Sequence, residues 1–392
     1  MERKIIYLDN AQSTRLDDRV LEAMKPYFFE YYGLPTTEVG HSLGVKLRED
    51  IYMARKKIAE SINAETEELI FTSGATEANN IAIQGFLRAN PEKRHVITSP
   101  IEHSSVLALL KLMEKNGLVE LSIVNVDEKG RVDLDHLNEL IRKDTALVSI
   151  QHANQEIGTI QNIEEIGKIC HDNGVVFHTD AAQSFLKVPI DVKRMNIDMM
   201  SITAHKIHGP KGIGALYIRK DIDVLPLIEG PFAEFGKRPG TENVPAIIGF
   251  AKAVEIWDWN DVERMKEMRD YLIKHLLEIE DSQLNGAKGD QRLCNNVNIS
   301  FKYIEGEAAL LHLDFRGIIV TTGSACFSRT LEPSYIILAL GKKHEDAHGS
   351  IRFSLSKYNT MDELPYVVES VKDVVTRLRE ISPIAKDGEE DV

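Results

Sequence analysis

Short apolar runs alternate along this chain with longer amphipathic stretches, and this alternation constrains the fold more than any other feature of the sequence. Several runs are apolar throughout, as is typical of strands that are buried on both faces of a helix-covered parallel sheet. The sequence therefore predicts an α/β fold with a large, mostly parallel sheet. The expected strands lie at residues 67–71, 95–98, 146–151, 175–178, 199–203 and 214–218, and the expected helices lie at about 76–87, from about 102, and at 163–173.

The pattern changes after about residue 244, and the rest of the chain suits a smaller α+β domain. A stretch rich in Glu, Lys, Arg, Met and Leu predicts one long helix over residues 245–277. Further strands are expected at 296–300, 318–320 and 350–355, and further helices at 305–313 and 361–381.

A chain of 392 residues is long enough for two domains. We expect a large domain over residues 15–255 and a small domain built from residues 1–14 and 256–382. Residues 383–392 form an acidic tail that we expect to be flexible.

The composition excludes several classes of function. A formal net charge of −14 disfavours stable binding to nucleic-acid phosphates. No run of about 18 apolar residues predicts a membrane span, and the first residues lack the apolar core of a signal peptide. Three widely spaced cysteines, Cys170, Cys294 and Cys326, form no CxxC or Cys/His cluster. We therefore expect no disulfide framework and no metal site, and a reducing cytoplasm as the compartment.

Two side chains with complementary chemistry follow two of the predicted strands. Asp180 comes just after the strand at 175–178, and Lys206 follows the strand at 199–203. Because strand carboxyl ends border the ligand crevice of an open α/β sheet, both residues would reach one crevice. Pyridoxal 5'-phosphate needs a lysine that forms a Schiff base and a carboxylate that keeps its pyridine nitrogen protonated. This pair, with His205 and nearby glycines, favours the cofactor over a surface lysine and a helix-capping aspartate.

Two further segments follow strands and face the same crevice in this interpretation. Residues 72–80, TSGATEANN, predict a helix N-terminus whose free N–H groups suit a phosphate, although an ordinary capped helix would have the same sequence. His103 follows the strand at 95–98, where its ring could stack on a flat cofactor and move protons. A structural role for this histidine is equally compatible with its surroundings.

A cysteine and an arginine in the second half of the chain are the remaining candidates. Cys326 lies among small and polar residues, which predicts an exposed loop whose thiolate can react. Cys170 and Cys294 are expected to be structural. Arg352 lies in a predicted strand between apolar neighbours, where it needs an anion. That anion is either a substrate carboxylate or an internal partner.

The chain resembles the cysteine desulfurase family, in the group with a longer cysteine-bearing loop. The resemblance implies the aspartate-aminotransferase-like (type I) fold of pyridoxal-phosphate enzymes, and a homodimer whose active sites are completed across the interface. The matching segments, in family order, are YLDNA (7–11), HSLG (41–44), FTSGATEANN (71–80), EH (102–103), EIGTIQ (156–161), HTDAAQS (178–184), AHKIHGPKGIGALYIR (204–219), RPGTENV (238–244), GSAC (323–326), LEPS (331–334) and SIRFSL (350–355).

The resemblance assigns a role to each matching position. Lys206 matches the Schiff-base lysine, Asp180 the partner of the pyridine nitrogen, and His103 the ring that stacks on the cofactor. Gln183 matches the residue that binds the phenolic oxygen. The positions that match the phosphate ligands are Ala75, Thr76, Thr203 and His205, with Thr241 contributed by the second subunit.

The implied reaction converts L-cysteine to L-alanine. Arg352 would bind the substrate carboxylate, and Cys326 would take the sulfur as a persulfide and deliver it to an acceptor. An iron–sulfur scaffold protein is the expected acceptor, with a tRNA-thiolation enzyme as the alternative. The family usually has two asparagines before EIG, where this chain has Asn154 and Gln155. We expect Gln155 to contact the cofactor and Asn154 the substrate.

Other departures from the family pattern bear on substrate choice and rate. Thr203 stands where serine is usual, and residues 230–235 replace a flexible glycine run, with Phe235 in place of an arginine. Two alternatives therefore stay open. One is a related pyridoxal-phosphate lyase, such as a selenocysteine lyase. The other is a weakly active paralogue that acts mainly as a binding partner in sulfur transfer.

Overall fold

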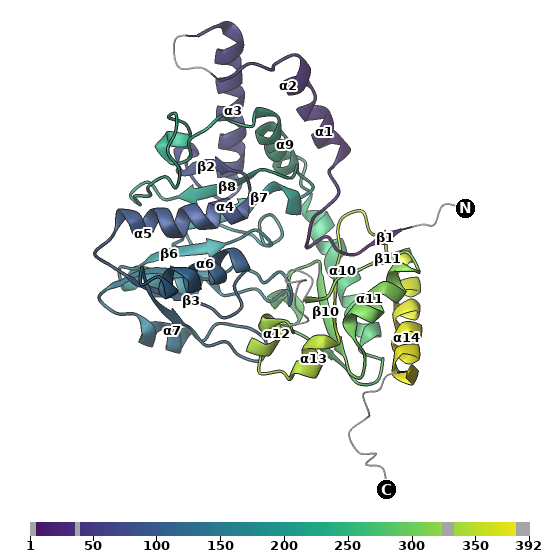
Figure 1. Ribbon diagram of the computed structural model, residues 1–392. Coiled ribbons are helices and arrows are strands. Elements are labelled where there is room, and N and C mark those ends of the chain that lie inside the picture. The colour runs from purple at the N-terminus through teal and green to yellow at the C-terminus, as the bar shows by residue number, and fades with distance from the viewer. Residues whose placement is uncertain (1–4, 36–39, 324–332, 382–392) are drawn as a thin grey trace.

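The computed structural model describes residues 5–35, 40–323 and 333–381 (Figure 1). Cys326 and the acidic tail over 383–392 lie outside the described residues. The centre of the molecule is a seven-stranded sheet in the order β2-β8-β7-β6-β5-β3-β4. In that order the strands are Leu69–Thr72, Gly214–Ile218, Met199–Thr203, Val176–Asp180, Thr145–Ser149, His95–Thr98 and Glu120–Ile123.

The pairing of these strands confirms the expected α/β class. Strand β8 is antiparallel to both of its neighbours, and every other pair in the sheet is parallel. All six expected strands are present, and β3, β7 and β8 have the expected bounds. The edge strand β4 was not expected, because its side chains are only exposed or half-buried and its sequence lacks an apolar run.

Helices cover both faces of the sheet, which explains why every strand except β4 is almost wholly buried. In β8, Ala215 and Tyr217 belong to one core cluster and Leu216 belongs to another. Successive side chains on a strand point to opposite faces, so both faces carry a core. The first core includes α3 (Ser42–Glu60), α8 (Ile163–Asp172) and α9 (Val244–Glu255), and the second includes α4 (Ala75–Asn80), α5 (Phe86–Ala89) and α6 (Ser104–Lys115).

A separate core cluster holds the elements expected in the small domain. Its sheet is antiparallel in the order β12-β10-β9, and in that order the strands are Ser350–Ser354, Asn296–Phe301 and Ser282–Leu284. Helices α10 (Trp259–Leu276), α11 (Gly306–Asp314) and α14 (Leu364–Ile381) pack on this sheet (Figure 1). Strand β1 (Ile6–Tyr7) pairs with β11 (Ile318–Ile319), so the N-terminal segment joins this cluster.

The expectation of one helix over residues 245–277 was wrong. Helix α9 ends at Glu255 and α10 begins at Trp259, because Asp258 leaves the helical conformation and caps α10 by accepting a hydrogen bond from the backbone N–H of Asn260 at 2.9 Å. Trp257 packs against the cores of both domains. The break therefore carries the chain from the large domain to the small one.

A buried ion pair anchors the segment that contains Phe235. Arg55 of α3 binds both carboxylate oxygens of Glu234, at 2.5 and 2.9 Å, and Glu234 also accepts the backbone N–H of Phe71 at 2.7 Å. Glu234 and Phe235 both have positive φ, 46° and 55°. Such a conformation is costly for bulky residues, so it needs strong local contacts to persist. The Arg55 guanidinium supplies one, since it lies 5.1 Å from the centre of the Phe235 ring.

We expect Arg55→Leu to lower the free energy of unfolding by about 3–5 kcal/mol, because it leaves the Glu234 carboxylate buried without a cation. Denaturant unfolding monitored by circular dichroism measures the change. Arg142→Leu is the matched control, since Arg142 pairs with Glu120 and Asp144 on the surface and its loss should leave the unfolding midpoint nearly unchanged. Equal effects of the two substitutions would contradict the assignment of Arg55 as an anchor.

Candidate active site

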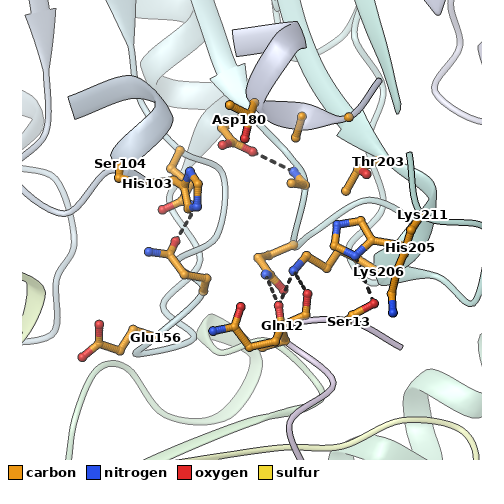
Figure 2. Close-up of a pocket in the computed structure, with 18 of the residues that line it drawn as sticks. Gln12, Ser13, His103, Ser104, Glu156, Asp180, Thr203, His205, Lys206 and Lys211 are labelled. Carbon is orange, nitrogen blue, oxygen red and sulfur yellow. Dashed lines mark hydrogen bonds between the residues drawn. The ribbon is translucent and has the colours of Figure 1, made fainter. Parts of the chain in front are cut away.

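A cavity of about 480 Å³ lies at the carboxyl edge of the large sheet (Figure 2). Asp180 ends β6, Thr203 ends β7, and His103 follows β3, so the parallel strands deliver these three side chains to one wall. The small domain closes the opposite side with Arg352 of β12. Ligands of open α/β sheets bind at this edge, as the sequence predicted.

The carboxylate of Asp180 is buried and held by amides. One oxygen accepts a hydrogen bond from Asn79 Nδ2 at 2.8 Å, and the other accepts the backbone N–H of Ala182 at 2.9 Å. Asp180 makes no ion pair within the described residues. A buried carboxylate in such surroundings suits a cationic N–H from a ligand.

Lys206 reaches the same cavity from the turn Ala204–Lys206, directly after β7. Its Nζ donates to the backbone oxygen of Gln12 at 2.6 Å and to that of Ala11. Figure 2 shows Lys206 and His103 entering the cavity from opposite sides. Because this turn follows β7 directly, the end of the strand determines where the Lys206 side chain enters the cavity.

The backbone hydrogen bond that His103 Nδ1 accepts assigns the ring proton to Nε2. Nδ1 accepts the backbone N–H of Ser105 at 3.2 Å and lies 2.8 Å from Ser105 Oγ. Burial lowers the pKa of His103, and the charge of Lys206 lowers it further while Asp180 opposes the shift. Asn79 Nδ2 also donates to Ser105 Oγ at 2.8 Å, which connects His103 to Asp180 through two polar side chains.

All but one of the predicted phosphate ligands line the cavity. Ala75 and Thr76 begin α4, Thr203 ends β7, and His205 lies in the turn after it. Burial lowers the pKa of His205 to about 3, so its ring is neutral. Thr241 is exposed and does not line the cavity of this chain. The predicted place of Thr241 in a second subunit's site stays a prediction.

Gln183, Gln155 and Arg352 line the cavity, and Arg352 is already paired. Gln183 donates to the backbone oxygen of Ala11 at 2.9 Å. Arg352 donates from one terminal nitrogen to Asp9 at 2.9 Å and from the other to the backbone oxygen of Gln155 at 3.1 Å. Its buried Nε has no hydrogen-bond partner in the described part of the chain. Arg352 therefore has an internal anionic partner, Asp9, and also lines the open cavity.

Asn154, like Thr241, is a predicted site residue that does not line the cavity. Its side chain is buried, and its oxygen accepts the backbone N–H groups of Glu156 and Ile157 at 2.8 and 2.9 Å. Cys326 lies outside the described residues, and the cavity is lined by Thr322 and Gly323 just before it in sequence.

Sequence reasoning missed two buried acids beside the cavity. Glu156 lines the wall, burial raises its pKa, and a Cβ added at Gly323 would lie 2.0 Å from its Oε1. Glu102 lies behind the wall and accepts Ser99 Oγ at 2.5 Å and the backbone N–H of Gln151 at 2.9 Å. Each is the first residue of a segment that matches the family, EH at 102–103 and EIGTIQ at 156–161, but only the fold shows that both are buried. No cluster of His, Cys, Asp and Glu able to hold a metal, and no helix able to cross a membrane, occurs among the described residues.

Comparison with known proteins decides the family. The model of the class-V aminotransferases matches residues 6–367. The chain belongs to this family, among the cysteine desulfurases. It is 47% identical to the cysteine desulfurase IscS of Dictyoglomus turgidum over 97% of both chains, and 46% identical to cysteine desulfurase IscS 1 of Archaeoglobus fulgidus over 96% of this chain and 99% of the relative.

Solved structures agree with this assignment. A NifS-like protein superposes with a TM-score of 0.88 at 35% identity, covering 95% of this chain and 100% of that one. A structure described as SspA in complex with cysteine gives a TM-score of 0.80 at 36% identity, covering 90% of this chain and 99% of that one. The expected type I fold and the family resemblance are confirmed.

The fully buried Glu102 predicts a distinctive pH dependence of stability. Burial raises its pKa to about 8, against the hydrogen bonds from Ser99 and Gln151. Between the unfolded pKa of about 4.3 and about 8, the folded state keeps a proton that the unfolded state releases, so the contribution of Glu102 to stability falls as the pH rises, by at most about 1.4 kcal/mol per pH unit.

Glu102→Gln removes this titration and keeps an oxygen acceptor for Ser99 and Gln151. We therefore expect the variant to gain stability relative to the unaltered protein as the pH rises from about 5 to about 8. Denaturant unfolding of both proteins across this range measures the difference. Parallel pH profiles would show that Glu102 is not protonated in the folded protein.

Proposed function

We propose that the chain is a pyridoxal-phosphate-dependent cysteine desulfurase that converts L-cysteine to L-alanine and transfers the sulfur to Cys326. The observation that carries this proposal is the placement of Asp180 and Lys206 at the ends of the paired parallel strands β6 and β7, facing one cavity. Both groups that the cofactor requires are therefore present in one site.

The residues of the cavity fit this cofactor. Asp180 is a buried carboxylate that forms no ion pair within the described residues, and a pyridine N–H would supply the missing cation. Lys206 offers the amine, and Gln183 offers an amide beside the backbone of Ala11. When bound, the cofactor delocalises the charge that develops at the α-carbon of the substrate.

The chain's own residues then supply binding and proton transfer. Arg352 receives the substrate carboxylate, and its pairing with Asp9 holds the guanidinium in place. The amine of Lys206 takes the α-proton, and His103, with its proton on Nε2, moves protons at the leaving group.

The sulfur is transferred by nucleophilic attack. The Cys326 thiolate attacks the substrate sulfur, and a bond between the two sulfurs forms as the substrate C–S bond breaks. The electron pair of that bond passes to the three-carbon product, which leaves as alanine after protonation.

A homodimer is part of the proposal. Thr241 matches a phosphate ligand of the family, and its position outside the cavity of its own chain supports a contribution to the site of a second copy. Exposed aromatic side chains on and beside α2 (Pro26–Phe29), namely Phe28, Phe29 and Tyr32, supply apolar surface for such an interface. On the family resemblance we propose an iron–sulfur scaffold protein as the sulfur acceptor, with a tRNA-thiolation enzyme as the alternative.

Cys326→Ala tests the function directly. We expect the purified variant to keep the visible absorption of a lysine Schiff base and to lose at least 99% of alanine and sulfide formation from L-cysteine with a thiol reductant, roughly the 10²-fold or greater loss typical of a removed nucleophile. Cys170→Ala is the control, because Cys170 is buried in the large core and should not affect turnover rate.

Alanine formation that persists in Cys326→Ala would contradict sulfur transfer to this cysteine and would favour the lyase alternative. Unaltered protein that absorbs in the visible range but makes neither product would favour the weakly active paralogue.

A further inference from the structure

Three side-chain amides beside the cavity form a hydrogen-bonded chain, and two of them line the cavity wall. Asn154 Nδ2 donates to Gln151 Oε1 at 3.4 Å, and Gln151 Nε2 donates to Gln155 Oε1 at 2.8 Å. Gln151 and Gln155 line the cavity, whereas Asn154 lies behind them. We call this chain of Asn154, Gln151 and Gln155 the amide relay.

The backbone fixes the direction of the relay at Asn154. The N–H groups of Glu156 and Ile157 both point at the same side-chain atom, so that atom is the oxygen of the amide. The Asn154 NH₂ group therefore faces the other way, where it donates to the backbone oxygen of Ile101 at 2.7 Å and to Gln151. A flipped Asn154 would place two N–H donors against its NH₂ and would lose both bonds.

The direction passes to the cavity through Gln151. Its backbone N–H is held by the buried Glu102 at 2.9 Å, and its side-chain oxygen accepts from Asn154. The NH₂ group of Gln151 therefore points toward Gln155 and donates a hydrogen bond to the side-chain oxygen of Gln155. The Gln155 group that remains for a ligand in the cavity is its NH₂ group, which can only donate hydrogen bonds.

We propose that Gln151 is a positioning residue that holds the Gln155 amide with its donor toward the cavity, and so favours ligands that place a carboxylate beside Arg352. Arg352 donates to the backbone oxygen of Gln155, so the two donors are parts of one wall. The inference rests on the proposed function for its substrate class, an α-amino acid. Without Gln151, the Gln155 amide can rotate and present its oxygen to the carboxylate.

The test compares two ligands of the holoenzyme that differ only by a carboxylate, L-alanine and ethylamine, with dissociation constants measured from the change in cofactor absorbance. Gln151→Met and Gln151→Leu keep the bulk of the side chain and remove its hydrogen bonds. We expect both to weaken L-alanine binding about tenfold or more, the loss typical of one hydrogen bond to a charged group, and to leave ethylamine binding unchanged.

Two controls separate positioning from damage to the fold. Gln161→Met removes another buried amide, one that bonds to Val132 and Gly130 outside the cavity, and should not change L-alanine binding. In a Gln155→Leu background, Gln151→Leu should have no further effect on L-alanine, because the relay then has no end group.

Unchanged L-alanine affinity in both Gln151 variants, or an equal loss for ethylamine, would overturn the amide relay and leave the proposed function intact. Unaltered protein whose absorbance responds to neither L-alanine nor L-cysteine would overturn the proposed function, and the relay proposal with it.

Discussion

A carboxylate buried at the end of β6 without an ion pair in the described chain is the constraint on which the site depends. Burying the charge of Asp180 costs free energy, and the chain offsets part of that cost with two N–H donors, Asn79 Nδ2 and the backbone of Ala182. Asn79 also binds Ser105, whose backbone and hydroxyl fix the tautomer of His103. The hydrogen bonds of Asn79 therefore help to position both the Asp180 carboxylate and the His103 ring. A protonated pyridine nitrogen would supply the cation that the carboxylate lacks within the described chain.

The opposite wall depends on contacts between the two domains. Arg352 belongs to the small domain, its partner Asp9 to the N-terminal segment, and Gln155 to the loop after β5 of the large domain. This arginine is thus held ready before any ligand arrives, which reduces the side-chain entropy lost on binding. Tyr335, at the start of α12 (Tyr335–Ala339), adds a further contact by donating to the backbone oxygen of Glu102 at 2.6 Å. On the proposed role of Arg352, substrate binding therefore depends on how these segments pack together.

Much of this arrangement could be predicted from the sequence, because buried strands appear in it as short apolar runs. The apolar runs predicted six strands of the large sheet, and the rule that ligands bind at strand carboxyl ends placed Asp180, Lys206 and His103 together. The edge strand β4 and the break between α9 and α10 escaped prediction. Strand β4 has no apolar run, and the break between the helices depends on the single capping residue Asp258.

The roles of buried polar residues could not be predicted in the same way. Asn154 and Gln155 are neighbours in sequence, yet one lies behind the cavity wall and the other in it. Glu102 precedes His103, but nothing in the sequence shows that its carboxyl group is fully buried. Such roles arise from hydrogen bonds between segments distant in sequence, and side-chain type alone does not fix them.

A Schiff base between Lys206 and pyridoxal 5'-phosphate, in the cavity that Asp180 also lines, is the linkage on which the proposed function depends. Reducing the purified protein with borohydride makes that linkage permanent, and peptide mass spectrometry then locates it. We expect a phosphopyridoxyl group on the peptide that contains Lys206, and its loss in Lys206→Ala. Modification of Lys211 or Lys187 instead, or no modification in protein supplied with the cofactor, would contradict it.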